Sequence, residues 1–394
     1  MTKEGGTGPS PPGAKGGVIR IMLVDDSAVI RGLFTRALES DPELQVVASV
    51  GDGKMALNAL KRQPVDVVVL DIEMPVMDGL TALPLLLQAQ PGLIVIMAST
   101  LTRRNADVSL RALQAGAKDY IPKPTSTSEL TSADTFKREL IEKIKALAGP
   151  LRSPRQEQPS LTRRVASDPN DRPAPQEKTP ASLRAFKSAT VTLRPVSTEV
   201  PEVLAIGSST GGPQALFQVL ADFPDRILQP IFITQHMPAT FTTILAEHLS
   251  RVTKRPCAEG KDGEPVVKGR IYVAPGDYHM IVEGAPGKEK VIRLLKTPPE
   301  NFCRPAVDPM LRSLIQAYGA RKILVTILTG MGQDGLRGAE QVVEQGGMVI
   351  AQDEPSSVVW GMPGAVATAG LCSAVLPLPE IGPALQRYAT GGRG

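Results

Sequence analysis

A serine in a glycine-rich loop is the first feature of this sequence that indicates chemistry. An apolar run at residues 203–206 leads into the segment GSSTGGP at 207–213, and a helical pattern of apolar residues follows. A serine on a tight turn between a strand and a helix is exposed, and the first N–H groups of the helix can stabilise an oxyanion. Ser209 is the central serine of a G-x-S-x-G pattern and is therefore the candidate nucleophile.

The same loop could instead bind a phosphate or a dinucleotide, because glycine-rich turns after a strand serve both purposes. The patterns G-x-x-x-x-G-K-[ST] and G-x-G-x-x-G are both absent from residues 207–213, which favours a serine hydrolase. A non-hydrolytic signalling module with a nucleotide- or phosphate-binding loop at 207–212 remains the alternative.

A nucleophilic serine needs a general base, and the chain contains only three histidines. His236 follows the apolar run 231–234, at the edge where sites form in parallel sheets, and is the favoured base. His248 lies within a helical pattern and is expected to be structural or exposed. His279 follows a turn and could line the substrate cleft.

An acid must orient the imidazole of such a base. Asp334 lies in a glycine-rich loop after the apolar run 323–328 and is the favoured acid, although it could simply cap the following helix. The resulting order of serine, histidine and aspartate along the chain differs from the familiar orders of serine hydrolases. The weaker candidates for the acid are Asp262, Asp277 and Asp353.

A second constellation of polar residues lies in the first half of the chain, at the ends of four apolar runs. Its members are Asp25, Asp26, Asp71, Ser99 and Lys123. Carboxylates gathered at one edge of a sheet repel one another and need a cation, and Mg2+ prefers oxygen ligands of this kind. Such residues can also be helix caps or solvated loop residues, but their joint placement favours a common site.

The elements that must position the second constellation alternate between strand and helix over residues 18–148. Near-continuous apolar strands separated by helices predict an α/β domain with a doubly wound, five-stranded parallel sheet of the flavodoxin-like type. The predicted strands are 19–24, 46–50, 65–70, 93–98 and 117–121.

The alternation resumes over residues 201–392 and predicts a second α/β domain with a mostly parallel sheet. A small antiparallel hairpin is expected within 272–295, because short strand patterns flank a Gly/Pro turn at 284–287. The predicted strands of the sheet are 203–206, 231–234, 269–274, 323–328 and 348–352.

The remaining segments differ in composition. Residues 149–200 are rich in Pro, Arg, Gln, Ser and Thr and predict a flexible linker, and residues 1–17 predict a disordered tail. No apolar run approaches the roughly 20 residues of a membrane span, so the sequence predicts a cytoplasmic protein and not a membrane protein. The scattered cysteines fit a reducing compartment, and the net charge of +4 without a helix-turn-helix pattern argues against a nucleic-acid partner.

The first half resembles the receiver domains of two-component response regulators. The matching segments are LVDDS at 23–27, LDIEMP at 70–75, MDG at 77–79 and KP at 123–124. The resemblance implies that Asp71 accepts a phosphoryl group from a histidine kinase in the presence of Mg2+. It implies that Mg2+ is held by Asp26, Asp71 and the backbone carbonyl of Glu73 with Asp25 beside them, that Ser99 and Lys123 contact the phosphoryl oxygens, and that Tyr120 reorients on activation.

The second half resembles the chemotaxis protein-glutamate methylesterases, which join a receiver to such a domain in this order. The matching segments are IGSSTGG at 206–212, QHMP at 235–238, YVAPG at 272–276, LTGMG at 328–332, DG at 334–335 and WGMP at 360–363. The resemblance implies a phosphorylation-activated hydrolase that demethylates glutamate methyl esters, and deamidates glutamines, on the cytoplasmic domains of chemoreceptors. It implies no cofactor in this catalytic domain.

Residue by residue, the resemblance makes Ser209 the nucleophile, His236 the general base and then acid, and Asp334 the orienting carboxylate. The backbone N–H of Met331 would contribute to the oxyanion hole. Cys303 stands where members of the family often carry histidine. Because it lies outside the triad, it is expected to affect substrate contacts and not the chemistry.

Overall fold

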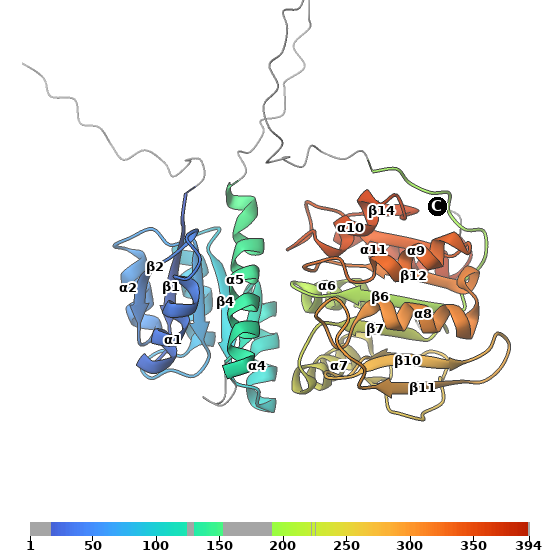
Figure 1. Cartoon of the computed structure of the whole chain (residues 1–394), viewed down its shortest axis with the longest axis horizontal. Coiled ribbons are helices and arrows are strands. Elements are labelled where there is room, and N and C mark those ends of the chain that lie inside the picture. The colour runs from blue at the N-terminus through green and yellow to red at the C-terminus, as the bar shows by residue number, and fades with distance from the viewer. Residues whose placement is uncertain (1–16, 124–129, 153–190, 222, 225, 393–394) are drawn as a thin grey trace, which may run out of the picture.

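The computed structural model describes residues 17–123, 130–152, 191–221, 223–224 and 226–392. These residues form two α/β domains that lie side by side, the first from blue to the green of α5 and the second from yellow-green to red in Figure 1. Each domain is built on its own parallel sheet, so the predicted fold class is confirmed.

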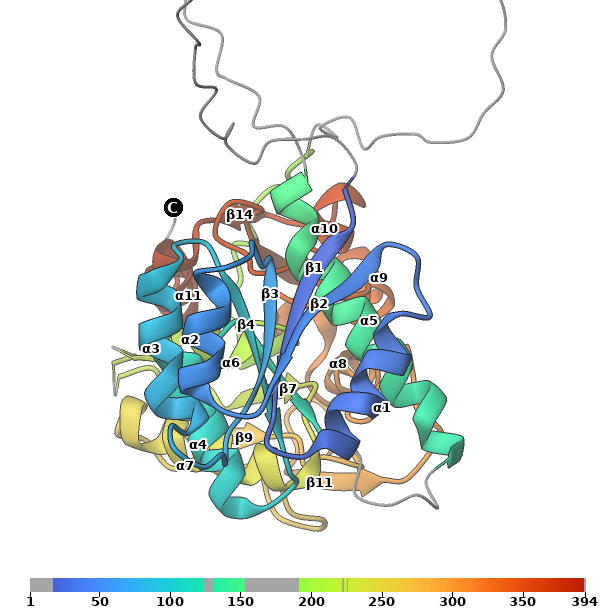
Figure 2. The same cartoon turned by 90° about the vertical axis from the view of Figure 1, so that its left-hand side faces the viewer.

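The first domain is a doubly wound sheet whose five parallel strands stand in the order β2-β1-β3-β4-β5. Helices α1 and α5 cover one face, and α2, α3 and α4 cover the other (Figure 2). The strands are β1 Ile19–Val24, β2 Leu44–Val50, β3 Val67–Asp71, β4 Ile94–Ser99 and β5 Asp119–Pro122. The helices are α1 Ala28–Leu38, α2 Gly53–Leu60, α3 Gly79–Ala89, α4 Arg103–Gln114 and α5 Leu130–Arg152.

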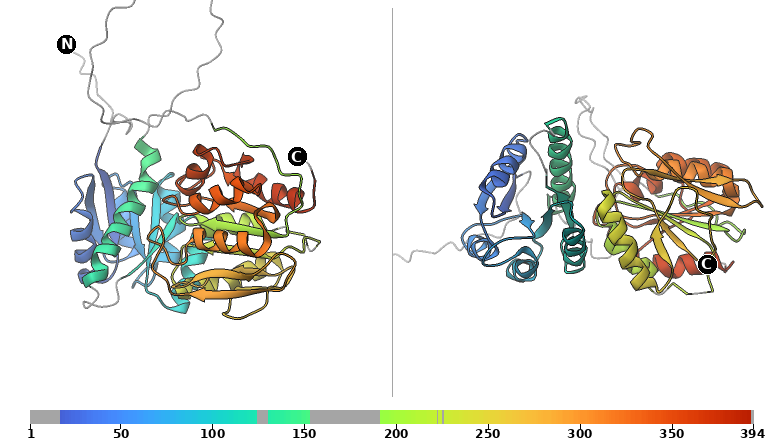
Figure 3. Two further views of the ribbon diagram at one scale, coloured as in Figure 1. Left: turned by 45° about the vertical axis from the view of Figure 1, so that its right-hand side comes forward. Right: turned by 90° about the horizontal axis from the view of Figure 1, so that it is seen from below.

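The second domain has a seven-stranded parallel sheet in the order β14-β13-β12-β6-β7-β9-β8, with helices on both faces (Figure 3). The predicted hairpin forms a separate antiparallel pair, β10 and β11. The strands are β6 Val203–Ser208, β7 Ile231–Gln235, β8 Cys257–Glu259, β9 Ile271–Val273, β10 His279–Gly284, β11 Lys290–Leu295, β12 Ile323–Ile327, β13 Met348–Gln352 and β14 Ala374–Leu376. The helices are α6 Gly212–Leu220, α7 Ala239–Thr253, α8 Val307–Tyr318, η1 Ala320–Lys322, α9 Leu336–Glu344, α10 Met362–Thr368 and α11 Leu378–Ala389.

The central strands of both sheets are buried along their whole length. Every residue of β3, β6, β7 and β12 is buried, which is why these strands read as continuous apolar runs and not as alternating patterns. Burial of each Val, Leu or Ile side chain contributes about 1.5–3 kcal/mol, so the sheet centres are rigid platforms for the loops that follow them.

Two of the predicted strands, 19–24 and 348–352, coincide with β1 and β13. The edge strands β8 and β14 were not predicted, because each is only three residues long and is mostly half-buried. The predicted strand 269–274 is shorter in the structure, where β9 covers three residues.

The predicted tail 1–17 and most of the predicted linker 149–200 lie outside the described residues. Helix α5 continues to Arg152 and so includes the first residues of that linker segment. Within the described ranges, no helix combines the length and the apolar character needed to cross a membrane.

Candidate active site and phosphorylation site

The loops that carry Ser209, His236 and Asp334 follow three adjacent strands. Ser209 follows β6, His236 follows β7, and Asp334 lies in the loop after β12. Since β12, β6 and β7 are parallel neighbours, their carboxyl ends meet at one edge of the sheet. The topology therefore brings the three predicted residues to a common edge.

Glycine is required where the two glycine-rich loops meet at Ser209. A Cβ added to Gly330 would lie 2.8 Å from the Cβ of Ser209, which is too close for any other residue. Gly211 has a φ of +75°, in the left-handed region that glycine adopts without strain. The backbone N–H of Ser209 donates to Thr329 O at 3.0 Å, and Gln235 Nε2 donates to Ser209 O at 2.9 Å. The serine is thus held by its backbone on two sides.

The carboxylate of Asp334 is buried and accepts hydrogen bonds from several donors. It accepts from His236 Nε2 at 2.8 Å and from the backbone N–H of Val307 at 2.6 Å. Burial would raise its pKa, but the hydrogen bond and charge of His236, with the N–H of Val307, hold the pKa of Asp334 below its usual range. Asp334 is therefore an ionised acceptor, so His236 Nε2 must carry a proton.

Asp334 also caps a helix, but not the helix that follows it. Its oxygens accept from the first two N–H groups of α8, at Val307 and Asp308, where Ala306 offers no side-chain cap. The helix dipole favours a negative charge at this end. Asp334 therefore both caps α8 and orients His236. The sequence analysis had treated helix capping and orientation of the base as alternative roles for this residue.

The second ring nitrogen of His236 contacts a sulfur atom. Cys303 Sγ lies 3.3 Å from His236 Nδ1, and no hydrogen bond joins Ser209 Oγ to the histidine within the described chain. Cys303 was expected to affect substrate contacts only, but it lies against the candidate base itself. Burial would lower the pKa of His236, yet the charge of Cys303 and the hydrogen bonds to Asp334 and Cys303 raise it to about 10. The contact with Cys303 and the ion pair with Asp334 therefore both favour the charged form of the imidazole.

Asn301 is a site residue that the sequence analysis missed. Its side-chain amide donates to Asp334 Oδ1 at 2.8 Å and to Asp308 Oδ2 at 2.9 Å, so one NH2 group bridges two carboxylates. Burial, and then the charge of Asp334, raise the pKa of Asp308. The only signal in the sequence was that Asn301 begins the segment NFCRP at 301–305, which contains Cys303.

The backbone N–H of Met331 makes no hydrogen bond within the described residues, as an oxyanion donor requires. The remaining histidines lie elsewhere. His248 is buried and contacts Asp107 of the first domain. The expectation that His279 could line the cleft is wrong, because His279 is fully buried between the backbone groups of Ala306 and Pro298. None of Asp262, Asp277 and Asp353 is hydrogen-bonded to His236 in the described structure.

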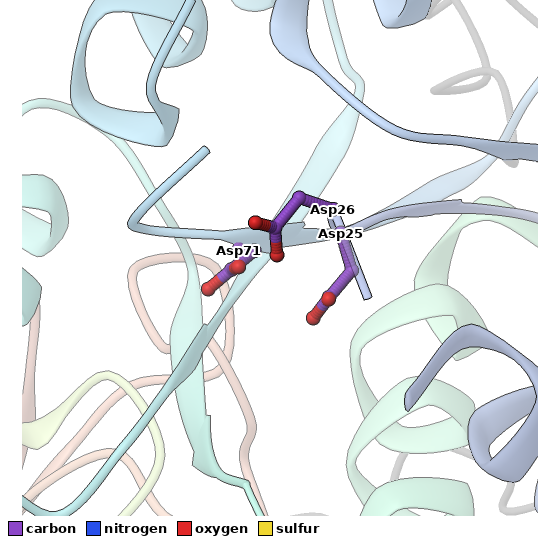
Figure 4. Close-up of side chains that lie close together, drawn as sticks. All are labelled: Asp25, Asp26 and Asp71. Carbon is purple, nitrogen blue, oxygen red and sulfur yellow. The ribbon is translucent and has the colours of Figure 1, made fainter. Parts of the chain in front are cut away.

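Three carboxylates gather at the carboxyl edge of the first sheet (Figure 4). Oxygen atoms of Asp25, Asp26 and Asp71 lie within 4.8 Å of one another. Lys123 Nζ lies 2.7 Å from an oxygen of Asp25 and 2.7 Å from one of Asp71. Burial, partly offset by Lys123, raises the pKa of Asp71. The one lysine offsets only part of the charge of three carboxylates, and this set of hard oxygen donors fits Mg2+.

Ser99 and Glu73 border this acidic site. The hydroxyl of Ser99 is buried and donates to the backbone oxygen of Thr100 at 3.1 Å. The Ser99 carbonyl accepts from the backbone N–H of Lys123 at 2.7 Å, which fixes the two strand ends together. The Glu73 side chain is exposed and points to Arg104 at 3.8 Å, so only its backbone is available for a metal at Asp71.

The first domain packs against the candidate active site through β5 and α4. The hydroxyl of Thr210, next to Ser209, donates to the carboxylate of Asp119 at 2.9 Å. The ring of Tyr120 stacks on Phe241 of α7 with centroids 4.4 Å apart. A direct contact between β5 and the serine loop therefore joins the first domain to the candidate active site.

Comparison with known families first gives the class of protein. Residues 21–134 match the model described as response regulator receiver domain, and residues 204–385 match the model described as CheB methylesterase. The class is a response regulator whose receiver is joined to a methylesterase-type hydrolase domain.

Individual relatives define the family more closely. The chain is 60% identical over 387 residues to the protein-glutamate methylesterase/protein-glutamine glutaminase of Azospirillum brasilense, covering 96% of this chain and 95% of that protein. It is 60% identical over 392 residues to the group 2 operon protein of the same name from Rhodospirillum centenum, covering 98% and 97%. The solved CheB methylesterase catalytic domain of Thermotoga maritima is 39% identical and covers 48% of this chain and 99% of that one, with a TM-score of 0.46. The chain belongs to the protein-glutamate methylesterase/protein-glutamine glutaminase family, which confirms the resemblance seen in the sequence.

Replacement of Asn301 by alanine is expected to lower kcat by about tenfold to a hundredfold, since a hydrogen bond to a charged group contributes roughly 1.5–3 kcal/mol. The KM should change little, because both amide hydrogen bonds of Asn301 go to the carboxylates of Asp334 and Asp308. Steady-state methanol release from methylated receptors measures both constants. A variant that raises KM at constant kcat would contradict this positioning role.

Replacement of Cys303 by alanine is expected to shift the pH profile of kcat/KM to lower pH by roughly one unit. The sign follows because Cys303 raises the pKa of His236, and a base with a lower pKa is unprotonated at lower pH. Rates between about pH 6 and pH 10 would show the shift. Cys257→Ala, at a cysteine with no hydrogen bond to His236, is the control, and an unchanged Cys303→Ala profile would refute the coupling.

Proposed function

We propose that this protein demethylates glutamate methyl esters, and deamidates glutamines, on the cytoplasmic domains of chemoreceptors, under the control of phosphorylation. The observation that carries the proposal is the His236–Asp334 pair on the strands that flank the strand of Ser209. The substrate is supported by relatives that carry both activities in their names. The proposed boundaries are a receiver at 18–148, a linker at 149–200 and a catalytic domain at 201–392, in a cytoplasmic protein.

The proposed reaction is acyl transfer through a serine. Ser209 Oγ attacks the ester carbonyl, and its proton passes to His236 Nδ1, because Nε2 is engaged by Asp334. The N–H of Met331 stabilises the oxyanion. His236 then protonates the leaving methanol, or ammonia from glutamine, and activates the water that hydrolyses the acyl-enzyme. This scheme requires no cofactor in the catalytic domain.

The arrangement described above corresponds to a form with low activity. His236 Nδ1 contacts Cys303 and not Ser209, so the histidine is not poised to accept a proton from Ser209. The first domain also lies against the loop next to Ser209 through Asp119 and Thr210. Movement of that domain would release the loop next to Ser209, which is the proposed mode of control.

Phosphorylation is proposed to occur at Asp71, with a chemotaxis histidine kinase as the phosphodonor. Bound Mg2+ would offset the charge of the carboxylates and the incoming phosphoryl group. The residues proposed to hold Mg2+ are Asp25, Asp26, Asp71 and the carbonyl of Glu73, and those proposed to contact the phosphoryl oxygens are Ser99 and Lys123. Lys123 would then exchange its present carboxylate partners for a phosphoryl oxygen, and Tyr120, stacked on Phe241, would transmit the change to the interface.

The first test is methanol release from methylated receptor membranes with acetyl phosphate and Mg2+. Stimulation of about tenfold or more is expected, within the usual range of coupling between sites. Ser209→Ala should lower release by about a thousandfold or more, and Asp71→Ala should remove the stimulation alone. Tight nucleotide binding, with release unaffected in Ser209→Ala, would favour a phosphate-binding loop at 207–212 instead.

The interface with α7 gives a second test. His248 Nε2 and Asp107 Oδ1 lie 2.8 Å apart across the two domains. Asp107→Lys removes the hydrogen bond between His248 and Asp107 and loosens the interface, so activity without phosphodonor should rise by about fivefold. Asp107→Lys with His248→Glu should restore the low activity, because the pair is re-formed with reversed charge. Arg104→Asp, an exposed reversal on the same helix, is the control and should leave that activity unchanged.

A further inference from the structure

The three thiols of the chain have different surroundings. All are free, and burial raises the pKa of both Cys257 and Cys372 to about 12, so these two are inert. Cys303 is only half-buried, and its sulfur lies 3.3 Å from the Nδ1 of His236. Of the three, it is the one hydrogen-bonded to a base.

Cys303, His236 and Asp334 form a second relay that shares its histidine with the candidate serine triad. Asp334 holds Nε2 at 2.8 Å and stabilises the imidazolium that forms when the thiol proton passes to Nδ1. Nucleophilic cysteines are activated by an adjacent histidine in this way. The relay is rigid, because Cys303 and Glu300 exchange two backbone hydrogen bonds, of 2.8 and 3.1 Å, across a tight turn.

We propose that Cys303 is a second nucleophile in the candidate active site. It is the site at which peroxides and other small electrophiles modify and inactivate the enzyme. The thiol proton moves to His236 Nδ1, and the thiolate attacks one oxygen of hydrogen peroxide. The O–O bond breaks, and the leaving hydroxide takes the imidazolium proton and becomes water. The sulfur is oxidised to a sulfenic acid, and the peroxide is reduced by two electrons.

Loss of hydrolysis follows from the position of the new hydroxyl, and this step rests on the proposed role of His236. The sulfenic O–H lies beside Nδ1 and donates to it, so the nitrogen cannot accept the proton of Ser209. A thiol reductant reverses the change. One thiol displaces water to form a mixed disulfide, and a second thiol releases the Cys303 thiol together with the reductant disulfide.

Labelling of the full-length protein with iodoacetamide at pH 7 tests the nucleophile without any need for esterase activity. The thiolate displaces iodide, and peptide mass spectrometry gives the rate at each cysteine. Cys303 should react roughly tenfold faster than Cys257 or more, since an unperturbed thiol is only a few per cent thiolate at this pH. His236→Ala should abolish the difference, and Ser209→Ala should preserve it. Equal rates at Cys303 and Cys257 would overturn the proposal.

Peroxide treatment tests the consequence for activity, with each variant compared with its own untreated rate. The rate of methanol release by the wild type should fall about tenfold and recover with dithiothreitol. The rates of Cys303→Ser and Cys303→Ala should not change on treatment. Dimedone should label Cys303 in the treated wild type. Equal loss in wild type and both variants would overturn the proposal. If untreated protein releases no methanol but Cys303 still reacts selectively, the proposed function fails and the nucleophile stands.

Discussion

The buried carboxylate of Asp334 imposes a constraint that much of the second domain satisfies. A buried charge without hydrogen-bond partners would cost several kcal/mol, so each donor that reaches this carboxylate stabilises the fold. The start of α8 supplies backbone N–H groups, the loop at 300–303 supplies the amide of Asn301, and β7 supplies His236. Asp334 therefore fixes the relative positions of a helix, a loop and a strand end. The catalytic geometry is one result of meeting its hydrogen-bonding needs.

Both candidate sites arise from the same property of parallel sheets, which gather the carboxyl ends of buried strands at one edge. Asp25 follows β1 and Asp71 ends β3, just as Ser209 and His236 follow β6 and β7. A polar residue directly after an apolar run is visible in a sequence. For this reason the sheets, their helices and most of the residues that meet at each edge could be predicted without coordinates.

The residues that escaped prediction come from segments without such a run. Asn301 and Cys303 lie in a turn between β11 and α8, and nothing in the spacing shows that this turn folds back onto Asp334 and His236. His279 looked available because it follows a turn, but its backbone partners, Ala306 and Pro298, are distant in sequence. Local patterns report burial and strand ends, whereas contacts of this kind depend on the tertiary path of loops.

Two polar contacts between the domains are built from groups that lose little when they separate. Asp119 is buried, yet it keeps Lys143 at 3.3 Å as its own counter-ion when Thr210 withdraws. A second contact joins the domains at Phe302, next to Cys303, where Arg138 of α5 lies 4.6 Å from the centre of the exposed ring. A cation–π pair at an exposed site contributes only about 0.5–1 kcal/mol. No buried charge is left unpaired by opening at these two points. These two contacts can therefore hold the first domain against the serine loop and the loop of Cys303 without making separation costly by themselves.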